Sequence, residues 1–229
     1  MKKALLIAGL IGASAVAVRA DTLALWTFET SQPAGTGLSI TASPESGSGL
    51  ATGSHTNAST AFASFVGNGS AHSMSADHWG IGDYWQFQTS TTGFQDVHLS
   101  YDQTGSATGP KSFDLSYSTD GSTFTLVGNF SVLQNGATPN ASWNSATAQS
   151  AYNFGDDLSS ITALNNASSV YFRLTDSSTV SINNGTVGTG GTDRIDNFAI
   201  TANPVPEPSS LFLLGGLGVL AIALARRHS

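Results

Sequence analysis

The sequence contains no cysteine among its 229 residues. Disulfide bonds and thiolate metal sites are therefore excluded. Secreted eukaryotic domains often carry disulfides, whereas many exported bacterial proteins carry none, so the absence of cysteine favours a bacterial origin.

Charged residues are scarce, at 10% of the chain, and most of the basic ones stand near its two ends. The span 21–208 holds fifteen acidic residues against three basic ones, which gives a net charge of −12. Such a span repels phosphate backbones, so we expect no binding to nucleic acid. The same charge attracts divalent cations.

Recognised catalytic motifs are also missing, because the chain has neither a G-x-S-x-G elbow nor an H-E-x-x-H pair. His55, His72, His78 and His98 are candidate bases. The Asp156-Asp157 pair could serve a glycosidase, but any acidic protein offers such carboxylates. We therefore expect no enzymatic activity.

Residues 1–20 are typical of a secretory signal peptide. Lys2 and Lys3 precede the apolar run 4–18, and small residues at Val18 and Ala20 predict cleavage by signal peptidase between Ala20 and Asp21. The alternative is an uncleaved membrane helix, which the run of 15 residues is too short to form comfortably, because spanning takes about 20 residues.

The C-terminal segment 204–229 combines three features in a fixed order. Its prolines fix an extended start, the apolar segment 211–225 predicts a single transmembrane helix, and a basic tail predicts a cytoplasmic end. This order, with Pro206-Glu207-Pro208 before the apolar segment, resembles the PEP-CTERM sorting signal. The alternative is an ordinary single-span anchor with a proline-rich stalk.

The resemblance to PEP-CTERM proteins carries several implications. It implies that a membrane protease called exosortase cuts at Pro206, Glu207 and Pro208 after transient anchoring in the inner membrane. It also implies a Gram-negative host that makes exopolysaccharide, with final residence at the cell surface or in the extracellular matrix.

Between the two ends, residues 21–203 alternate apolar and polar residues with the period of β-strands, so they predict an antiparallel β-sandwich. The predicted strands are 23–29, 84–88, 97–102, 113–118, 124–126, 170–175 and 195–201. The glycine-rich stretches 47–53 and 185–191 predict loops, and Leu158, Ile161 and Leu164 predict one short helical turn.

The stretch 78–132, with GDYWQF and SYDQTGSATGPKSFDLSYSTDGSTF, resembles a sandwich domain found in exported PEP-CTERM proteins. The later RLTD and DRIDNFAIT segments complete this resemblance. The region is more loosely similar to jelly-roll carbohydrate-binding modules of the galactose-binding type, so we expect a jelly-roll topology.

A structural calcium ion is the first candidate site. Glu29 ends the first predicted strand, Asp193 and Asp196 flank the start of the last one, and these two strands are often close in jelly rolls. Asp196 shares its face of the strand with Phe198 and Ile200, so we expect it to point inward, where Ca²⁺ would satisfy its carboxylate. The alternative is an ion pair with Arg173 or Arg194.

A sugar-binding face is the second candidate site. Its aromatic groups would be Trp79, Tyr84 and Trp143, beside the hydrogen-bonding carboxylates Asp83 and Asp102. Trp79 lies in a predicted turn and is the best candidate for an exposed ring. The alternative is that these rings belong to the core, as alternation predicts for Trp85.

These observations predict an exported, non-enzymatic structural or adhesive protein associated with exopolysaccharide or a biofilm. A carbohydrate-binding module with a specific sugar site is the second hypothesis, and a glycoside hydrolase is the third.

Overall fold

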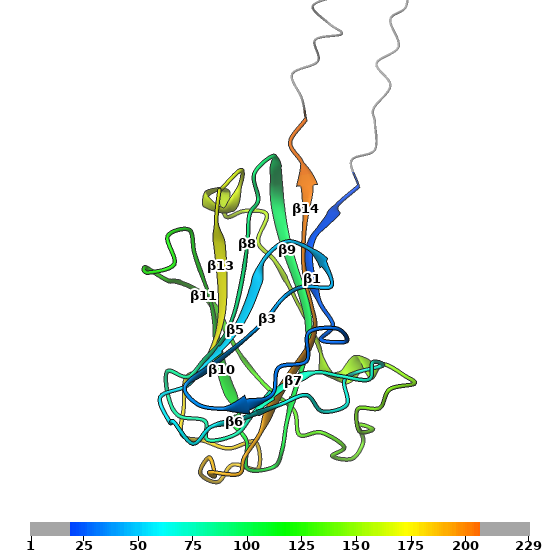
Figure 1. The fold of residues 1–229 in the computed structure, drawn as a ribbon, viewed down its shortest axis with the longest axis vertical. Coiled ribbons are helices and arrows are strands. Elements are labelled where there is room, and N and C mark those ends of the chain that lie inside the picture. Colours follow the sequence, from blue (N-terminus) through cyan, green and yellow to red (C-terminus); the bar gives the residue numbers. More distant parts are fainter. Residues whose placement is uncertain (1–18, 207–229) are drawn as a thin grey trace, which may run out of the picture.

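The computed structural model describes residues 19–206, and these fold into two antiparallel β-sheets packed face to face (Figure 1). The predicted transmembrane helix 211–225 and most of the predicted signal peptide lie outside the described residues. The all-β sandwich is therefore confirmed, whereas the jelly-roll connectivity stays a prediction.

The first sheet has eight strands and the second has six. The first sheet contains β1 (Asp21–Trp26), β2 (Gly35–Thr36), β4 (Ser46–Gly47), β6 (Ala61–Ala63), β7 (Met74–Ala76), β9 (Phe94–Gly105), β12 (Asn153–Asp157) and β14 (Asp193–Pro204). The second contains β3 (Ser39–Ala42), β5 (Leu50–Ser54), β8 (Tyr84–Thr89), β10 (Ser112–Ser118), β11 (Thr125–Ser131) and β13 (Val170–Asp176).

Strand β14 organises the first sheet. It pairs with β9 along one side, and β7 and β1 pair with successive parts of its other side. The expected closeness of the first and last strands is confirmed, because Trp26 of β1 lies opposite Phe198 of β14.

Aromatic side chains from both sheets form the centre of the core. The rings of Phe87 and Phe198 stack with centroids 3.6 Å apart, and Trp26 packs edge-on against Phe87 at 5.2 Å. All three side chains are fully buried. Strands β8 and β14 lie in different sheets, so this stack holds the two layers together.

The predicted strands recur in the structure with shifted ends. Strand β1 stops at Trp26 because Phe28 has a positive φ of 58°, although Ala24, Trp26 and Phe28 are all buried. The expected helical turn is the 3₁₀ helix η2 (Thr162–Leu164), and a second one, η1, spans Ser150–Tyr152.

The expectation of a loop over residues 47–53 is wrong, because the structure places the last residue of β4 and most of β5 there. Two glycines in this stretch allow neighbouring groups to approach the backbone closely. A Cβ on Gly47 would lie 1.9 Å from the Leu23 carbonyl oxygen, and one on Gly53 would lie 2.5 Å from the Trp85 ring. The expected loop over 185–191 is confirmed.

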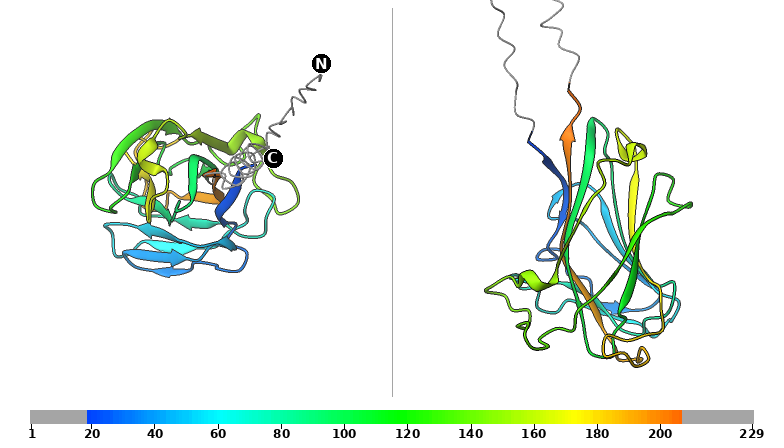
Figure 2. Two further views of the ribbon diagram at one scale, coloured as in Figure 1. Left: turned by 90° about the horizontal axis from the view of Figure 1, so that it is seen from above. Right: turned by 180° about the vertical axis from the view of Figure 1, so that it is seen from behind.

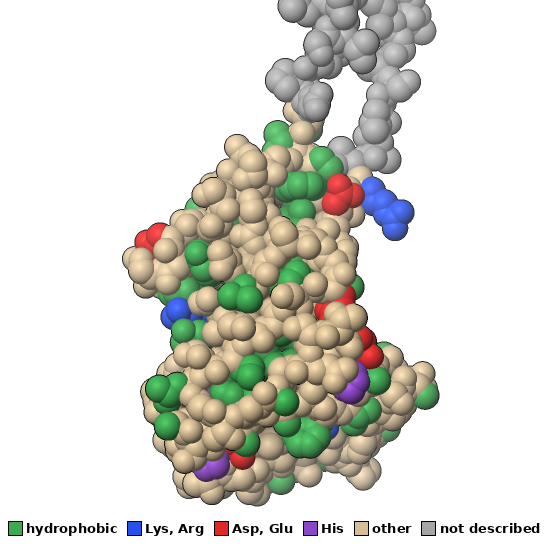
Figure 3. All heavy atoms as spheres, in the orientation of Figure 1, with side chains coloured by type: hydrophobic (Ala, Val, Ile, Leu, Met, Phe, Trp, Pro, Cys, Tyr) green, Lys and Arg blue, Asp and Glu red, His purple; other side chains and the backbone are tan. Residues whose placement is uncertain are grey.

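The surface is mostly uncharged. In Figure 3 the visible face is dominated by uncharged polar side chains and backbone, with few acidic and basic groups between small apolar patches. This matches the low content of charged residues and gives a sandwich whose outer faces carry hydroxyl and amide groups.

Candidate functional site

The two ends of the described chain leave the sandwich at the same end. Asp21 at the start of β1 pairs with Ala202 near the end of β14, and the two strands lie side by side in Figures 1 and 2. Ala20 and Asp21 are exposed, and so is Pro206 after β14. Both predicted processing regions therefore adjoin the same end of the domain.

The three residues predicted to bind calcium do not form one cluster. Asp193 points into the core, where its carboxylate accepts hydrogen bonds from Trp85 Nε1 at 2.7 Å and Gln103 Nε2 at 3.0 Å. Complete burial raises the pKa of Asp193 well above its ordinary value. The Asp193 carboxylate therefore belongs to a hydrogen-bond network between the sheets.

The Asp196 side chain points to the outer face of the first sheet, away from the core. The expectation that it points inward with Phe198 and Ile200 is therefore wrong. Asp196 lies opposite Asp102 whereas Ile200 lies opposite Leu99, because a β-bulge between Asp196 and Ala199 shifts the register. Asn197, inside the bulge, has a positive φ of 50°. A bulge reverses the alternation that sequence reasoning assumes.

A loop at residues 67–72 covers the Asp196 carboxylate. Oδ2 accepts hydrogen bonds from the Asn68 amide at 2.8 Å and the Ser70 hydroxyl at 2.5 Å. Burial raises the pKa of Asp196 to about 7, although these donors oppose the shift. The amide of His72 in turn donates to Glu29 Oε1 at 2.8 Å, so the loop bridges Glu29 and Asp196.

Protein donors thus bind at least one carboxylate oxygen of each residue expected to bind the ion. Within residues 19–206, no group of three or more His, Asp or Glu side chains is placed to hold a metal ion. Neither Arg173 nor Arg194 forms an ion pair with Asp196 within the described chain. Calcium binding stays a prediction, and this arrangement does not fit it.

The residues of the predicted sugar face are mostly buried. The expectation that Trp79 is exposed is wrong, since 6% of it is accessible. His78 has a positive φ of 52°, and the Trp79 ring that follows packs 5.0 Å from Trp85 and 5.5 Å from Phe113. Trp143 is buried against Tyr152 at 6.1 Å.

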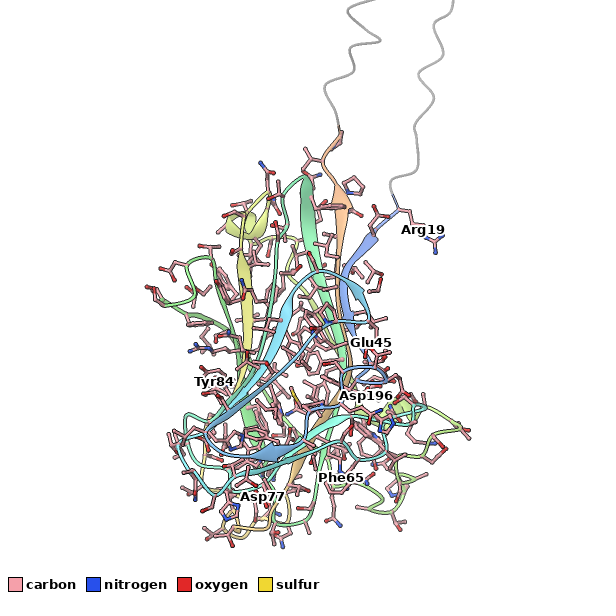
Figure 4. The ribbon with its side chains drawn as sticks, viewed as in Figure 1. Arg19, Glu45, Phe65, Asp77, Tyr84 and Asp196 are labelled. Atoms are coloured by element: carbon pink, nitrogen blue, oxygen red, sulfur yellow. The ribbon has the colours of Figure 1, made fainter. Side chains whose placement is uncertain are left out.

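The carboxylates of that predicted face are also buried. Asp83 accepts hydrogen bonds from the backbone amides of Thr56 and Gly80, both at 2.8 Å. Asp102 accepts hydrogen bonds from Asn153 and Asn197. Tyr84, which is half-buried, is the one member of the set that faces outward from the second sheet, and Figure 4 shows it well apart from Asp196.

Of the four candidate catalytic histidines, His55 lies in the core beside a carboxylate. Its Nδ1 lies 3.4 Å from Asp83 Oδ2, and both side chains are inaccessible to solvent. Burial lowers the pKa of His55, although Asp83 opposes the shift. The rings of Trp79 and Phe62 pack against it at 4.4 and 5.2 Å. No substrate reaches a group enclosed in this way.

The C-terminal segment gives the decisive comparison. A family model described as the PEP-CTERM protein-sorting motif matches residues 204–227. The chain carries a PEP-CTERM sorting motif. That motif implies export to the cell surface of a Gram-negative bacterium and processing by an exosortase-type protease.

Two solved structures resemble the sandwich of this PEP-CTERM protein. The K3 cleaved adhesin domain of Lys-gingipain from Porphyromonas gingivalis W83 is 14% identical, with a TM-score of 0.42, 79% of this chain covered and 98% of that one. The K1 domain is 12% identical, with a TM-score of 0.38 and coverages of 64% and 84%. Identity this low does not bear on function. A comparison with curated proteins found no significant match.

The sorting motif of the PEP-CTERM protein begins at the last residues that the structure describes. Pro206 is exposed after β14, whereas Glu207, Pro208 and the helix predicted over 211–225 lie outside the described residues. Within residues 19–206, no helix is long and apolar enough to cross a membrane.

Sequence reasoning missed the role of Arg173 in this PEP-CTERM protein. Its guanidinium lies between the rings of Tyr84 and Phe124 on the outer face of the second sheet. The alternation of Tyr171, Arg173 and Thr175 with buried neighbours places it on the outer face. The contact with Phe124 depends on the β10–β11 turn, which the alternation does not describe.

Proposed function

We propose that this protein is a non-enzymatic structural or adhesive component of the cell surface or extracellular matrix, associated with exopolysaccharide. The observation that carries the proposal is the sorting motif at 204–227, which begins at the last residue of β14. The hydroxyl-rich surface with few charged groups supports this role, since hydroxyl and amide groups form hydrogen bonds with sugars, while the net negative charge repels nucleic acid.

The proposed processing uses both ends of the chain. Signal peptidase would cut between Ala20 and Asp21, and an exosortase-type protease would cut near Pro206, Glu207 and Pro208. The segment 211–225 would hold the protein in the inner membrane between the two cuts. The exposure of Ala20, Asp21 and Pro206 supports access by both proteases.

A carbohydrate-binding module with a specific sugar site is the second proposal. The half-buried, outward Tyr84 supports it, whereas Trp79 and Trp143 lie in the core. A hydrolase has less support, because its predicted pair, Asp156 and Asp157, occupies successive positions of β12, so the two carboxylates point to opposite faces of the sheet.

Intact mass spectrometry of the protein recovered from cells and medium tests the sorting proposal. The wild type should lack both ends, with a C-terminus near residues 206–209. Glu207→Ala should keep the tail and stay in the membrane fraction. Ser210→Ala, which changes a neighbouring residue outside the Pro-Glu-Pro motif, should be processed like the wild type.

A wild-type protein that keeps residues 211–229 and stays in the inner membrane would contradict the sorting proposal. Calorimetry with polysaccharides then separates the two functional proposals. Weak, non-saturating binding supports a structural role in the matrix, whereas saturable binding with a fixed stoichiometry supports a specific sugar site.

A further inference from the structure

The outer face of the second sheet presents an arginine fixed between two aromatic rings. The Arg173 Cζ atom lies 4.0 Å from the centroid of the Tyr84 ring and 3.7 Å from that of Phe124. Arg173 Nε also donates a hydrogen bond to Gln86 Oε1 at 2.7 Å. Tyr84 and Gln86 belong to β8, Arg173 to β13 and Phe124 to the β10–β11 turn. Three segments thus hold one guanidinium in place.

This guanidinium has no acidic partner in the described chain. The ion pairs within residues 19–206 all involve histidine, and none includes Arg173. An arginine stacked on aromatic rings keeps a planar fork of N–H donors that matches a carboxylate. Such a group is pre-organised for an acidic ligand, because little of its side-chain freedom is left to lose on binding.

A shallow groove of about 350 Å³ lies on the same side of the sheet. Gln88, which lines it, follows Gln86 by two residues of β8 and so points to the same face, about 7 Å further along the strand. Leu50, Ser90, Ser168 and Ser169 also line the groove, and no charged side chain does. Its amide and hydroxyl groups match the hydroxyl groups of neutral sugars.

We propose that Arg173, with Tyr84, Gln86 and the groove beside Gln88, binds a polysaccharide in which carboxylate-bearing sugars alternate with or branch from neutral ones. One guanidinium followed by an uncharged groove matches one acidic sugar followed by neutral sugars. A dense polyanion fits less well, because the span 21–208 carries a net charge of −12 and this face offers one cation. The proposal names the sugar class for the proposed exopolysaccharide association and therefore rests on it.

The test is calorimetric titration of the soluble protein with oligosaccharides that contain glucuronate, galacturonate or mannuronate. Each is compared with its methyl ester, in which the carboxylate is neutral and the sugar is otherwise unchanged. We expect at least one acidic oligosaccharide to bind in a saturable way and its ester to bind at least tenfold more weakly. Raising the salt concentration should weaken binding of the acidic oligosaccharide and leave binding of its methyl ester unchanged.

Matched variants assign the binding to Arg173. Arg173→Met removes the cation but keeps an apolar chain between the two rings, and it should weaken binding at least tenfold. Lys111→Met removes another cation, one that contacts Asn184 in a different loop, and should stay within twofold of the wild type. Arg173→Lys should weaken binding several-fold, because an ammonium group lacks the planar fork.

Two outcomes would overturn the proposal. If no acidic oligosaccharide binds the wild type better than its ester, the acidic-sugar specificity is wrong. If Arg173→Met binds like Lys111→Met while its thermal unfolding shows a folded protein, the site is elsewhere. Processing at residues 206–209 is measured separately, so the sorting proposal survives either result, and wild-type binding that does not depend on Arg173 leaves the exopolysaccharide association standing.

Discussion

Replacing the buried carboxylate of Asp176 should make the protein more stable at neutral pH. Asp176 ends β13 on the core side, where 1% of it is accessible and Oδ2 has no hydrogen-bond partner. Burial and the nearby Asp83 raise its pKa to about 6, although the Ser178 amide opposes the shift. Asp193 also lies near enough for its own pKa to be raised by Asp176.

The sign of the pH dependence follows from this shift. The folded state holds the Asp176 proton up to a pH near 6, whereas the unfolded chain releases it near pH 4. Between these values the folded state binds more protons, so stability falls as the pH rises. Two pKa units correspond to about 3 kcal/mol, and relaxation around the carboxylate reduces the expected loss to on the order of 2 kcal/mol.

Urea unfolding monitored by tryptophan fluorescence at pH 4, 5, 6 and 7 measures this effect. The difference in free energy of unfolding between Asp176→Asn and the wild type should move in favour of the variant by about 2 kcal/mol across this range. Asp157→Asn is the control, because the Ser159 hydrogen bonds lower the pKa of that exposed carboxylate and reverse the sign. A difference for Asp176→Asn that does not change with pH would refute the reasoning.

Two further predictions concern the core and a turn. Phe198→Ala should lower the free energy of unfolding by about 3–5 kcal/mol, because it removes one ring of the stack between the sheets. Leu126→Ala, at a residue that is 58% exposed, should change it by less than about 0.5 kcal/mol; equal effects in urea unfolding would contradict this account. Asp120→Ala should speed hydrogen exchange in the β10–β11 turn, because Asp120 Oδ1 accepts both the Ser122 and Thr123 amides at 2.8 Å. Asp120→Asn should keep part of the protection, and exchange equal to that of the alanine variant would count against this role.

The sequence predicted the layers of the fold because period-2 alternation reports which face of a strand is buried. It therefore placed Trp85 correctly in the core, and Phe87, Phe113 and Phe172, which lie in predicted strands, are buried there too. It was less informative between residues 30 and 78, where β2, β4, β6 and β7 are two or three residues long. Strands this short do not establish an alternation.

The candidate site residues were harder to predict because their orientation depends on local backbone geometry. The bulge at Asn197 sends Asp196 to the side opposite Ile200, and the turn at His78 buries Trp79. Asn197 and His78 have positive φ angles, which residue type alone does not reveal. The sorting motif was predictable because its order of prolines, apolar run and basic tail is read along the chain and needs no contacts.

The position of β14 also determines how the protein would carry mechanical load. Its C-terminal end leads into the sorting segment, and its two sides pair with β9 and with β1 and β7. A pull on that end acts along the strand, so the ladder hydrogen bonds on both sides are sheared together rather than opened one at a time. A ligand held on the second sheet would transmit such a pull through the Phe87–Phe198 stack. A protein tethered by this end would therefore resist a flow that drags on its ligand.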